Sequence, residues 1–349
     1  MLANKEGITR SPGLPTVNQT QAYQAEDVLV SNIRPYFRKI WFANRDGGCS
    51  NDVLVLRAKE TCVPGFLYYL LSDNSFFDYA AATGKGTKMP RGDKGAIMRY
   101  AVPDVPLDAQ IGIAGTLSAL DARIVENRKI NHHLEQMAQT IYKSWFVDFE
   151  PWGGVMPSNW HLISLADIMD YAGGSQPPAS EFISEDIEGY IRFVQIRDYE
   201  TDAHITYIPV SAKNKLCTAE DIMLARYGAA LGRICYGIDG AYNVALAKVS
   251  PRKPEYREFL RCFLTSDAFY EGLNKKGNRS AQSGFNRSDI KSFALAFPGN
   301  DDILVIFETT VGPLFQLCLH NKKENARLAA LRDTLLPRLM SGELSIQGA

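Results

Sequence analysis

The feature that most constrains the fold is an internal repeat with a period of 194 residues. Matching segments keep this offset along the chain: 26–30 with 220–224, 39–40 with 233–234, and 127–131 with 321–325. Chance similarity between apolar patterns does not hold one offset over such a distance. The repeat therefore predicts two copies of one folding unit, and a chain of 349 residues has room for both.

The two copies differ in completeness and in loop length. Arg-Gly-Asp at 91–93 is matched with Arg-Ser-Asp at 287–289 at an offset of 196, which indicates small loop insertions. Residues 158–194 of the second copy have no counterpart, because Gln195 aligns with Met1. We therefore expect the front of the first copy to lack the 37 residues that correspond to 158–194.

Each copy is predicted to contain a mixed helix and strand portion followed by a long helix. In the second copy, short apolar runs bounded by turn residues favour strands at 191–196, 222–225 and 244–249, and the apolar spacing over 256–273 favours one or two short helices. The predicted class is α+β, with two tandem mixed α/β domains. The predicted boundaries are 1–106 for the first domain, 107–150 for the central helix, 151–300 for the second domain and 301–349 for the C-terminal helix.

The two long helices carry matching heptad seams. From Leu117 and from Val311, alternating steps of three and four place apolar residues on one face. Arg332 interrupts the second seam, and we expect Leu331 to take its place as the helix drifts. Both seams have asparagines at their centre: Asn127, Asn131, Asn321 and Asn325. This predicts an antiparallel coiled coil in which Asn faces Asn and fixes the register; two unrelated amphipathic helices on their own domains are the alternative.

The charge balance excludes a protein that coats nucleic acid by bulk charge, because 38 basic and 39 acidic residues leave a net charge of −1.

Six scattered cysteines without a C-x-x-C pair are typical of reduced thiols in a cytosolic protein. The N-terminus has no apolar core of signal-peptide length, and no unbroken apolar run approaches the roughly 20 residues of a membrane span. We expect a cytoplasmic protein without a membrane partner.

Basic loops recur where enzyme and metal motifs do not. None of the five histidines stands at zinc-ligand spacing, and no nucleophile elbow or phosphate loop occurs. A local excess of +4 lies over 85–99 and again over 275–291, and Arg34 and Arg38 are taken as loose counterparts of Arg226 and Arg233. The candidate DNA-binding residues are Arg34, Arg38, Lys85, Lys88, Arg91, Arg197, Arg226, Arg233, Lys275, Arg279, Gln282, Asn286 and Arg287. A solvated loop is the alternative for each cluster.

Several motifs point to a known family. They are Phe193-Val194-Gln195-Ile196-Arg197-Asp198-Tyr199, Ala225-Arg226-Tyr227-Gly228-Ala229, Gly240-Ala241-Tyr242-Asn243-Val244-Ala245, Tyr142-Lys143-Ser144-Trp145-Phe146-Val147-Asp148-Phe149 and Leu336-Pro337-Arg338-Leu339-Met340-Ser341-Gly342-Glu343-Leu344. With these motifs the chain resembles, over nearly its whole length, the specificity (S) subunit of type I restriction–modification enzymes.

The resemblance implies two target-recognition domains that each read one half of a bipartite DNA site, held apart by an antiparallel helix pair. It implies a non-catalytic chain without a cofactor of its own. Adenine methylation with S-adenosylmethionine would belong to two methyltransferase (M) subunits, and cleavage with ATP and Mg to restriction (R) subunits. A helix over 117–146 would be about 45 Å long, or roughly 13 base pairs of duplex. A coiled-coil scaffold that binds protein and no specific DNA sequence is the alternative.

Overall fold

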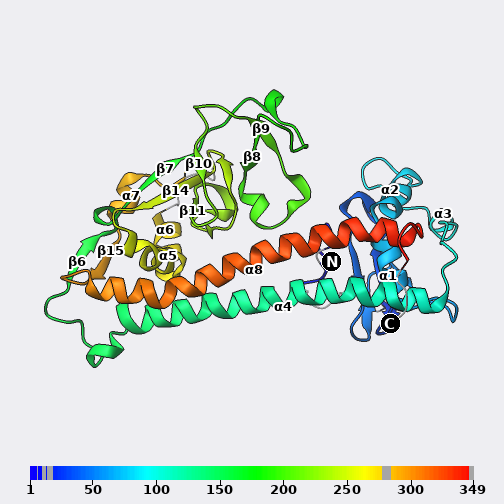
Figure 1. The fold of residues 1–349 in the computed structure, drawn as a ribbon, viewed down its shortest axis with the longest axis horizontal. Coiled ribbons are helices and arrows are strands. Elements are labelled where there is room, and N and C mark those ends of the chain that lie inside the picture. The colour runs from blue at the N-terminus through cyan, green and yellow to red at the C-terminus, as the bar shows by residue number, and fades with distance from the viewer. Residues whose placement is uncertain (6, 10–12, 14–18, 277–283, 346–349) are drawn as a thin grey trace. The chain divides into compact units, whose positions relative to one another are not determined.

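The computed structural model describes residues 1–349 except 6, 10–12, 14–18, 277–283 and 346–349. The chain divides into two compact units. Unit 1 comprises residues 1–126 and 324–349, and unit 2 comprises residues 127–323. Two long helices, α4 (Leu107–Phe146) and α8 (Asp302–Met340), each contribute to both units (Figure 1).

Unit 2 contains three sheets. Their strand orders are β12-β11-β14-β7, β10-β13-β8-β9 and β15-β6, and the only parallel pair among the described strands is β13 with β8. The bounds are β6 (His161–Ser164), β7 (Met169–Gly173), β8 (Tyr190–Val194), β9 (Tyr207–Pro209), β10 (Leu216–Cys217), β11 (Ile222–Ala225), β12 (Ile234–Cys235), β13 (Gly240–Tyr242), β14 (Leu246–Pro251) and β15 (Ala294–Phe297). The three predicted strands are confirmed, with their ends shifted by up to two residues.

Short helical elements connect these strands. The α-helices are α5 (Arg257–Thr265), α6 (Asp267–Lys276) and α7 (Arg287–Lys291). The 3₁₀ turns are η2 (Glu150–Trp152), η3 (Leu165–Asp167), η4 (Ala179–Glu181), η5 (Ile196–Tyr199), η6 (Asp202–His204), η7 (Gly228–Ala230) and η8 (Pro254–Tyr256). The predicted helical region over 256–273 therefore contains two helices, α5 and α6.

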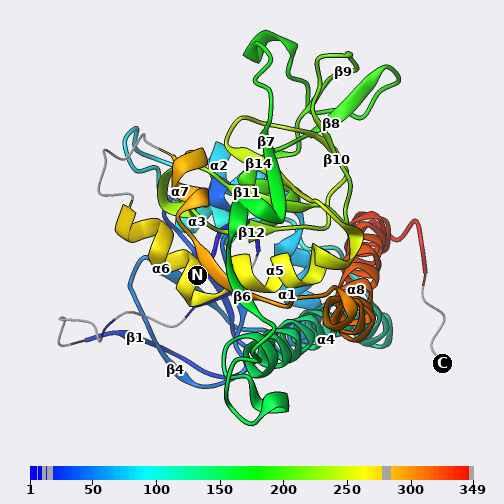
Figure 2. The same cartoon turned by 90° about the vertical axis from the view of Figure 1, so that its left-hand side faces the viewer.

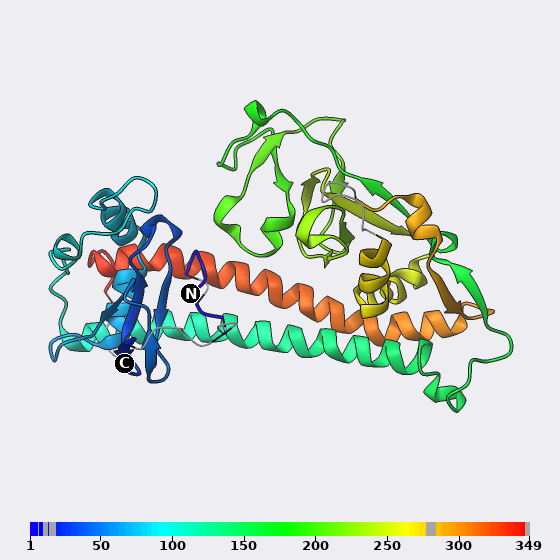
Figure 3. The ribbon, with the colours of Figure 1, turned by 180° about the vertical axis from the view of Figure 1, so that it is seen from behind.

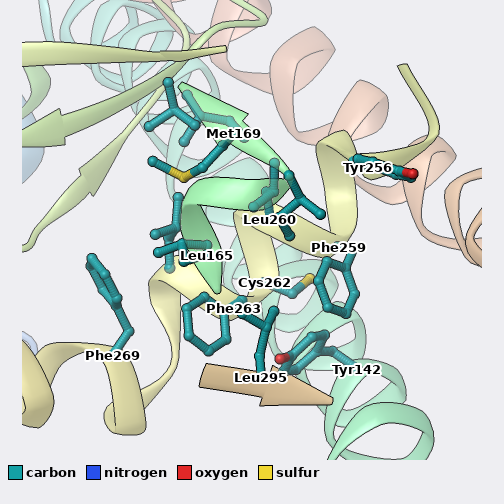
Figure 4. Close-up of a cluster of buried hydrophobic side chains, with 14 of the residues drawn as sticks. Tyr142, Leu165, Met169, Tyr256, Phe259, Leu260, Cys262, Phe263, Phe269 and Leu295 are labelled. Atoms are coloured by element: carbon teal, nitrogen blue, oxygen red, sulfur yellow. The ribbon is translucent and has the colours of Figure 1, made fainter. Parts of the chain in front are cut away.

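The core of unit 2 joins the mixed portion to the long helices. Phe259 and Phe263 of α5 lie in one apolar cluster with Tyr142 of α4 and Leu295 of β15 (Figure 4). Figure 2 shows α5 beside α4 and α8. Burying a large apolar side chain contributes about 1.5–3 kcal/mol. These contacts therefore hold the sheet of β11 and β14 and the sheet of β15 on the helices of the same unit.

Unit 1 is smaller and has the same plan. A three-stranded sheet has the order β3-β2-β5, and β1 pairs with β4. The bounds are β1 (Gln21–Tyr23), β2 (Val28–Ser31), η1 (Pro35–Phe37), β3 (Ile40–Phe42), β4 (Gly47–Cys49), β5 (Val53–Leu56), α1 (Pro64–Ser72), α2 (Asn74–Ala82) and α3 (Lys94–Ile97). Proline at the first position favours the start of α1, and the Asp73 carboxylate caps α2 by accepting from the Ser75 N–H.

The repeat is visible in the hydrogen bonds as well as in the strands. Asp27 accepts the backbone N–H of Gln24 at 2.7 Å, and Asp221 accepts that of Thr218 at 2.7 Å. Each carboxylate also pairs with a basic side chain, Arg57 in unit 1 and Lys248 in unit 2. Gln24 and Thr218 are 194 residues apart, and so are Asp27 and Asp221. The duplication predicted from the sequence is therefore a duplication of structure.

The two central sheets differ at one edge. In unit 2, β14 pairs with β11 on one side and β7 on the other. In the described part of unit 1, the equivalent strand β5 pairs with β2 alone. The strand β7 lies in 158–194, the stretch of the second copy that has no counterpart in the alignment.

One detail of the predicted alignment is wrong. Asp93 caps α3 by accepting from the Ala96 N–H at 3.0 Å, and Asn286 caps α7 by accepting from the Asp289 N–H at 3.0 Å. The two caps are 193 residues apart, so Asp93 corresponds to Asn286 and not to Asp289. The sequence match at an offset of 196 followed the Arg-x-Asp letters, whereas the helix start depends on the capping position.

The two long helices run antiparallel within each unit, as predicted. In unit 2, Asn131 contacts Asn321, while Phe146, further along α4, lies 5.1 Å from Phe307, which is earlier in α8. In unit 1, Leu117 of α4 shares a buried cluster with Leu336 and Leu339 of α8. Figure 3 shows the start of α4 beside the end of α8 in unit 1.

The predicted replacement of Arg332 by Leu331 in the seam is wrong. Leu331 is 47% exposed, and Arg332 keeps its place facing α4. There the Arg332 guanidinium donates to the Asp121 carboxylate at 2.7 Å, and the Tyr69 hydroxyl donates to the other oxygen of Asp121 at 2.8 Å. A charged residue remains in the seam because the facing helix supplies its counter-ion.

One stretch of α8 is more apolar than the sequence patterns indicated. An 18-residue window of this helix has a mean hydropathy of 1.5, which is enough by composition for a membrane span. In unit 2, however, Leu304, Phe307 and Val311 of α8 are completely buried in the main apolar cluster. Of this window 39% is buried, and the buried face of α8 packs on α4 and α5 within unit 2.

Candidate nucleic-acid interface

The predicted basic residues of unit 1 converge on one place. The loop that follows α2 turns back on itself, because Lys85 and Arg91 exchange backbone hydrogen bonds at 2.8 and 2.9 Å. The same loop pairs with the segment after β2, where the Arg34 N–H donates to the Pro90 carbonyl at 2.7 Å. Backbone pairing therefore brings the segments that carry Arg34, Lys85 and Arg91 together, with Lys88 in the turn between Lys85 and Arg91.

The basic side chains of this loop are exposed and partly neutralised. Lys85 pairs with Asp93 at 2.6 Å, and Arg91 pairs with Asp52 at 3.0 Å. The Lys85 ammonium lowers the pKa of Asp93 to about 2, so that this carboxylate stays ionised and anchors the loop to the start of α3. Lys88 is exposed at the tip between them. Exposed pairs of this kind are weak and exchange readily for phosphate.

In unit 2, Arg226 follows β11 and lies in a confined place. Its guanidinium stands over the Tyr227 ring at 5.0 Å, and its Nη1 donates to the Val244 carbonyl at 3.4 Å. A Cβ at Gly173 would come within 2.6 Å of this Nη1, so a side chain there would displace the guanidinium. Among the described residues, the buried Nε of Arg226 has no acceptor. Arginine stacked and aimed in this way is suited to planar acceptors.

Arg287 is at the start of α7, and Phe285, two residues before it, packs against Tyr171 with ring centroids 5.2 Å apart. Arg226 and Arg287 both act on Tyr171: burial raises the pKa of this phenol, and the two positive charges oppose that rise. Asn286 was predicted to read bases, but its Oδ1 accepts the N–H groups of Ser288 and Asp289 and caps α7. The side-chain oxygen of Asn286 is therefore already used inside the protein.

The remaining predicted residues are scattered. Arg197 is half exposed and lies 3.9 Å from the buried Asp198, Arg233 pairs with Glu200, and Lys275 pairs with Glu271 at 3.2 Å. Arg279 and Gln282 lie outside the described residues. In unit 2, Arg226 and Arg287 both act on Tyr171. Among the described residues, no hydrogen bond or ion pair links Arg197, Arg233 or Lys275 to this place.

The predicted equivalence of the arginines in the two copies is also corrected. The strand pairing of β2 and β11 makes Asn32 the counterpart of Arg226, and Lys39 the counterpart of Arg233. Asn32 is buried, and among the described residues its Oδ1 has no donor. The offset of 194 gives the same equivalence, whereas the pairing of Arg34 and Arg38 with Arg226 and Arg233 rests on charge alone. Sequence reasoning also missed Phe37, whose ring lies beside Arg34, and Tyr227, whose ring lies beside Arg226, as well as the exposed Tyr36.

The described residues contain no group of three or more His, Cys, Asp or Glu side chains placed to hold a metal ion. All six cysteines are free thiols. Burial raises the pKa of the Cys235 thiol to about 11 and that of Cys217 to about 12, which disfavours the thiolate at neutral pH.

The fold and these surfaces define a class: a tandem-repeat protein whose two mixed units, each continued by a long helix, present basic segments after equivalent strands. The chain is a homologue of the specificity subunits of type I restriction enzymes. The MjaIX specificity subunit of Methanocaldococcus jannaschii is 27% identical over 83% of this chain and 71% of its own length. The HindI specificity subunit of Haemophilus influenzae is 25% identical over 93% of this chain and 88% of its own.

A solved structure shows the same fold. The S subunit of a type I restriction–modification system from M. genitalium matches 97% of this chain and 90% of its own length, with a TM-score of 0.58 and 18% sequence identity. No protein-family model matches the chain. The fold class predicted from the repeat and the seams is thus confirmed.

Proposed function

We propose that this chain is the DNA-recognition subunit of a type I restriction–modification complex in the cytoplasm. Each unit reads one half of a bipartite site, and the helix pair sets the spacing between the halves. The observation that carries the proposal is that a basic residue follows the central strand in both units, Arg34 in unit 1 and Arg226 in unit 2, at positions that are not equivalent in the repeat. Lysines and exposed arginines would contact phosphates, and Arg226 and Arg287 would contact base edges.

The partners would supply the chemistry and much of the DNA-binding surface. We assign S-adenosylmethionine to two M subunits, and ATP and Mg to R subunits. A net charge of −1 fits a subunit that does not hold DNA by bulk charge and relies on local patches. Holding the duplex in register would let an M subunit flip its target adenine.

The test is selection of DNA by the reconstituted complex. Full-length chain, assembled with its M subunits, is incubated with a random pool of duplex DNA, and the retained DNA is sequenced. We expect enrichment of a two-part sequence with a constant gap, and adenine methylation in both parts when S-adenosylmethionine is added. Assembly without any enriched sequence would support the alternative, a coiled-coil scaffold for proteins.

A control separates recognition from assembly. Arg226→Ala alters the proposed reading surface of unit 2, which lies away from the Asn131–Asn321 contact between α4 and α8. The variant complex should assemble as the unmodified one does and should lose selectivity in one half of the sequence. Loss of assembly would assign Arg226 a structural role.

A further inference from the structure

The two units share a tight turn directly after their central strands. In unit 1 it covers 34–38 and includes η1; in unit 2 it covers 228–232 and includes η7. The Phe37 N–H donates to the Arg34 carbonyl at 2.9 Å, and the Leu231 N–H donates to the Gly228 carbonyl at 3.1 Å. The backbone is left-handed at the first and last position of both turns. These are therefore two copies of one turn.

The residues at the left-handed positions differ between the copies. Unit 2 has Gly228 and Gly232, with φ of 69° and 84°. Unit 1 has Arg34 and Arg38 at the same positions, with φ of 50° and 49°. Glycine adopts this conformation without steric cost, whereas a side chain crowds the following carbonyl. Unit 1 therefore has two arginines in a strained backbone conformation, at positions where unit 2 has glycine and no strain.

Neighbouring segments hold the strained turn in place. The Arg34 N–H donates to the Pro90 carbonyl, as described above. The Asn4 N–H donates to the Phe37 carbonyl at 2.8 Å, and the Lys5 N–H donates to the Arg38 carbonyl at 2.9 Å. Strain of this kind persists where the surroundings over-determine the backbone, and it occurs preferentially at binding sites.

The turn of unit 1 presents charge and aromatic surface together. Tyr36 is 52% exposed and Phe37 is 37% exposed. The Arg34 guanidinium and the Lys39 ammonium lie 5.9 and 5.7 Å from the centre of the Phe37 ring, and Arg38 makes a loose pair with Asp78 at 3.4 Å. The corresponding turn of unit 2 has the sequence Gly-Ala-Ala-Leu-Gly at 228–232. Cations beside exposed rings are the combination that binds a nucleic-acid backbone and its bases.

We propose that the turn 34–38 is a DNA clamp specific to unit 1, in which Arg34 and Arg38 contact phosphates and Tyr36 packs on the adjacent nucleotide. The clamp rests on the proposed function, and it adds an asymmetry: the turn 228–232 makes no such contact, so the two half-sites are held unequally. Unit 1 has the smaller sheet. Through this turn it makes DNA contacts that Arg226 and its neighbours make in unit 2.

The test is the variant Arg34→Gly/Arg38→Gly, which gives unit 1 the residues that unit 2 has at these positions. Binding of the full complex to duplex DNA is measured from 50 to 200 mM salt, with the selected site and with a random-sequence duplex. We expect about 30-fold weaker binding at 0.15 M salt and a salt slope smaller by about 1.8, on both duplexes, because phosphate contacts do not depend on sequence. The thermal midpoint of the complex should be unchanged or higher, because strain is removed.

Two further variants complete the test. Arg34→Lys/Arg38→Lys keeps both charges and should retain the salt slope. Tyr36→Ala should weaken binding about 5-fold or more without a change in slope. An unchanged slope in the double glycine variant, or a lower thermal midpoint together with lost binding, would overturn the clamp. If the complex selects no sequence but the slope falls on random duplex, the proposed function fails and the clamp stands.

Discussion

Asn321 donates a hydrogen bond from its side-chain Nδ2 to the Oδ1 of Asn131 at 2.8 Å, and both side chains are buried between α8 and α4. Asn131 in turn donates from its own Nδ2 to the Cys318 carbonyl at 3.2 Å. A buried amide pair stabilises only the alignment in which both partners meet. Within unit 2, this contact therefore fixes the register of the helix pair.

Asn131→Leu should destabilise unit 2 by about 1–3 kcal/mol, because the Asn321 amide loses its acceptor in a site without access to water. Leucine has a similar shape, so the loss reports the unsatisfied polar group and not a cavity. The free energy of unfolding is measured by urea titration of the full-length chain.

The matched control is Asn131→Leu/Asn321→Leu, which removes both polar partners. We expect this double variant to be more stable than either single variant, since two leucines pack where two amides were paired. Strictly additive losses in the double-mutant cycle would show that the two asparagines do not act as a pair.

The sequence was sufficient for features that depend on periodic burial, and insufficient for features that depend on the facing residue. The heptad seam predicted both long helices and an asparagine facing an asparagine, because one face of a helix is a property of its own sequence. The particular pair, Asn131 with Asn321, comes from the structure. The place of Arg332 depends on Asp121, which is on another helix, and periodicity does not show it. Similarly, the sequence at Arg34 does not indicate a left-handed backbone, since most left-handed turns use glycine. The structure shows it at Arg34 and at Gly228, the equivalent position of unit 2.

Asp27→Asn should make unit 1 less sensitive to acid. Asp27 is 1% exposed and receives two hydrogen bonds from Arg57, which lower the pKa of this carboxyl below its ordinary value. The stabilisation is therefore complete above the unfolded-chain pKa of about 3.9 and is lost as the pH falls through the lower folded-state value. Urea titrations at pH 7 and pH 3 should show that Asp27→Asn is less stable at pH 7 and that the difference shrinks at pH 3.

A suitable comparison for this variant is Glu60→Gln, because Glu60 is exposed and lies in the loop before α1 of the same unit. It should follow the pH dependence of the unmodified chain. A constant difference between Asp27→Asn and the unmodified chain from pH 7 to pH 3 would contradict the role of the ionised pair.

The buried thiols should be inert in the folded chain. Burial raises the pKa of the thiols of Cys217, Cys235, Cys262 and Cys318. A thiol with a pKa near 11 is thiolate to about one part in a thousand at pH 8, so its reaction with a disulfide reagent is slowed about 100-fold or more. Native labelling with a chromogenic disulfide at pH 8 should leave these four cysteines unmodified, and all six should react in urea. Rapid native labelling of Cys235 would indicate that β12 opens.

Arg91→Ala and Arg287→Ala should weaken DNA binding through different units. Arg91 lies on the basic loop of unit 1, whereas Arg287 begins α7 in unit 2 and lies close enough to Tyr171 to oppose the rise in its pKa. Each substitution removes contacts from one unit only, and losing one good base contact costs about 1–3 kcal/mol, or about 5- to 150-fold in affinity. The readout is a panel of duplexes with single changes in either half, bound by each variant complex at fixed salt.

The pattern of losses distinguishes a base contact from a phosphate contact. If Arg287 reads a base, the Arg287→Ala complex should bind duplexes that differ only at that base pair with equal affinity. It should still discriminate at the other positions of the site. If Arg91 contacts only phosphate, Arg91→Ala should weaken every duplex by the same factor and reduce the salt slope by about 0.9. Because Arg91 already pairs with Asp52, and such a pair exchanges readily for phosphate, we expect the second pattern for Arg91 and the first for Arg287. Loss of discrimination in both halves for Arg287→Ala would contradict the assignment of one half-site to each unit.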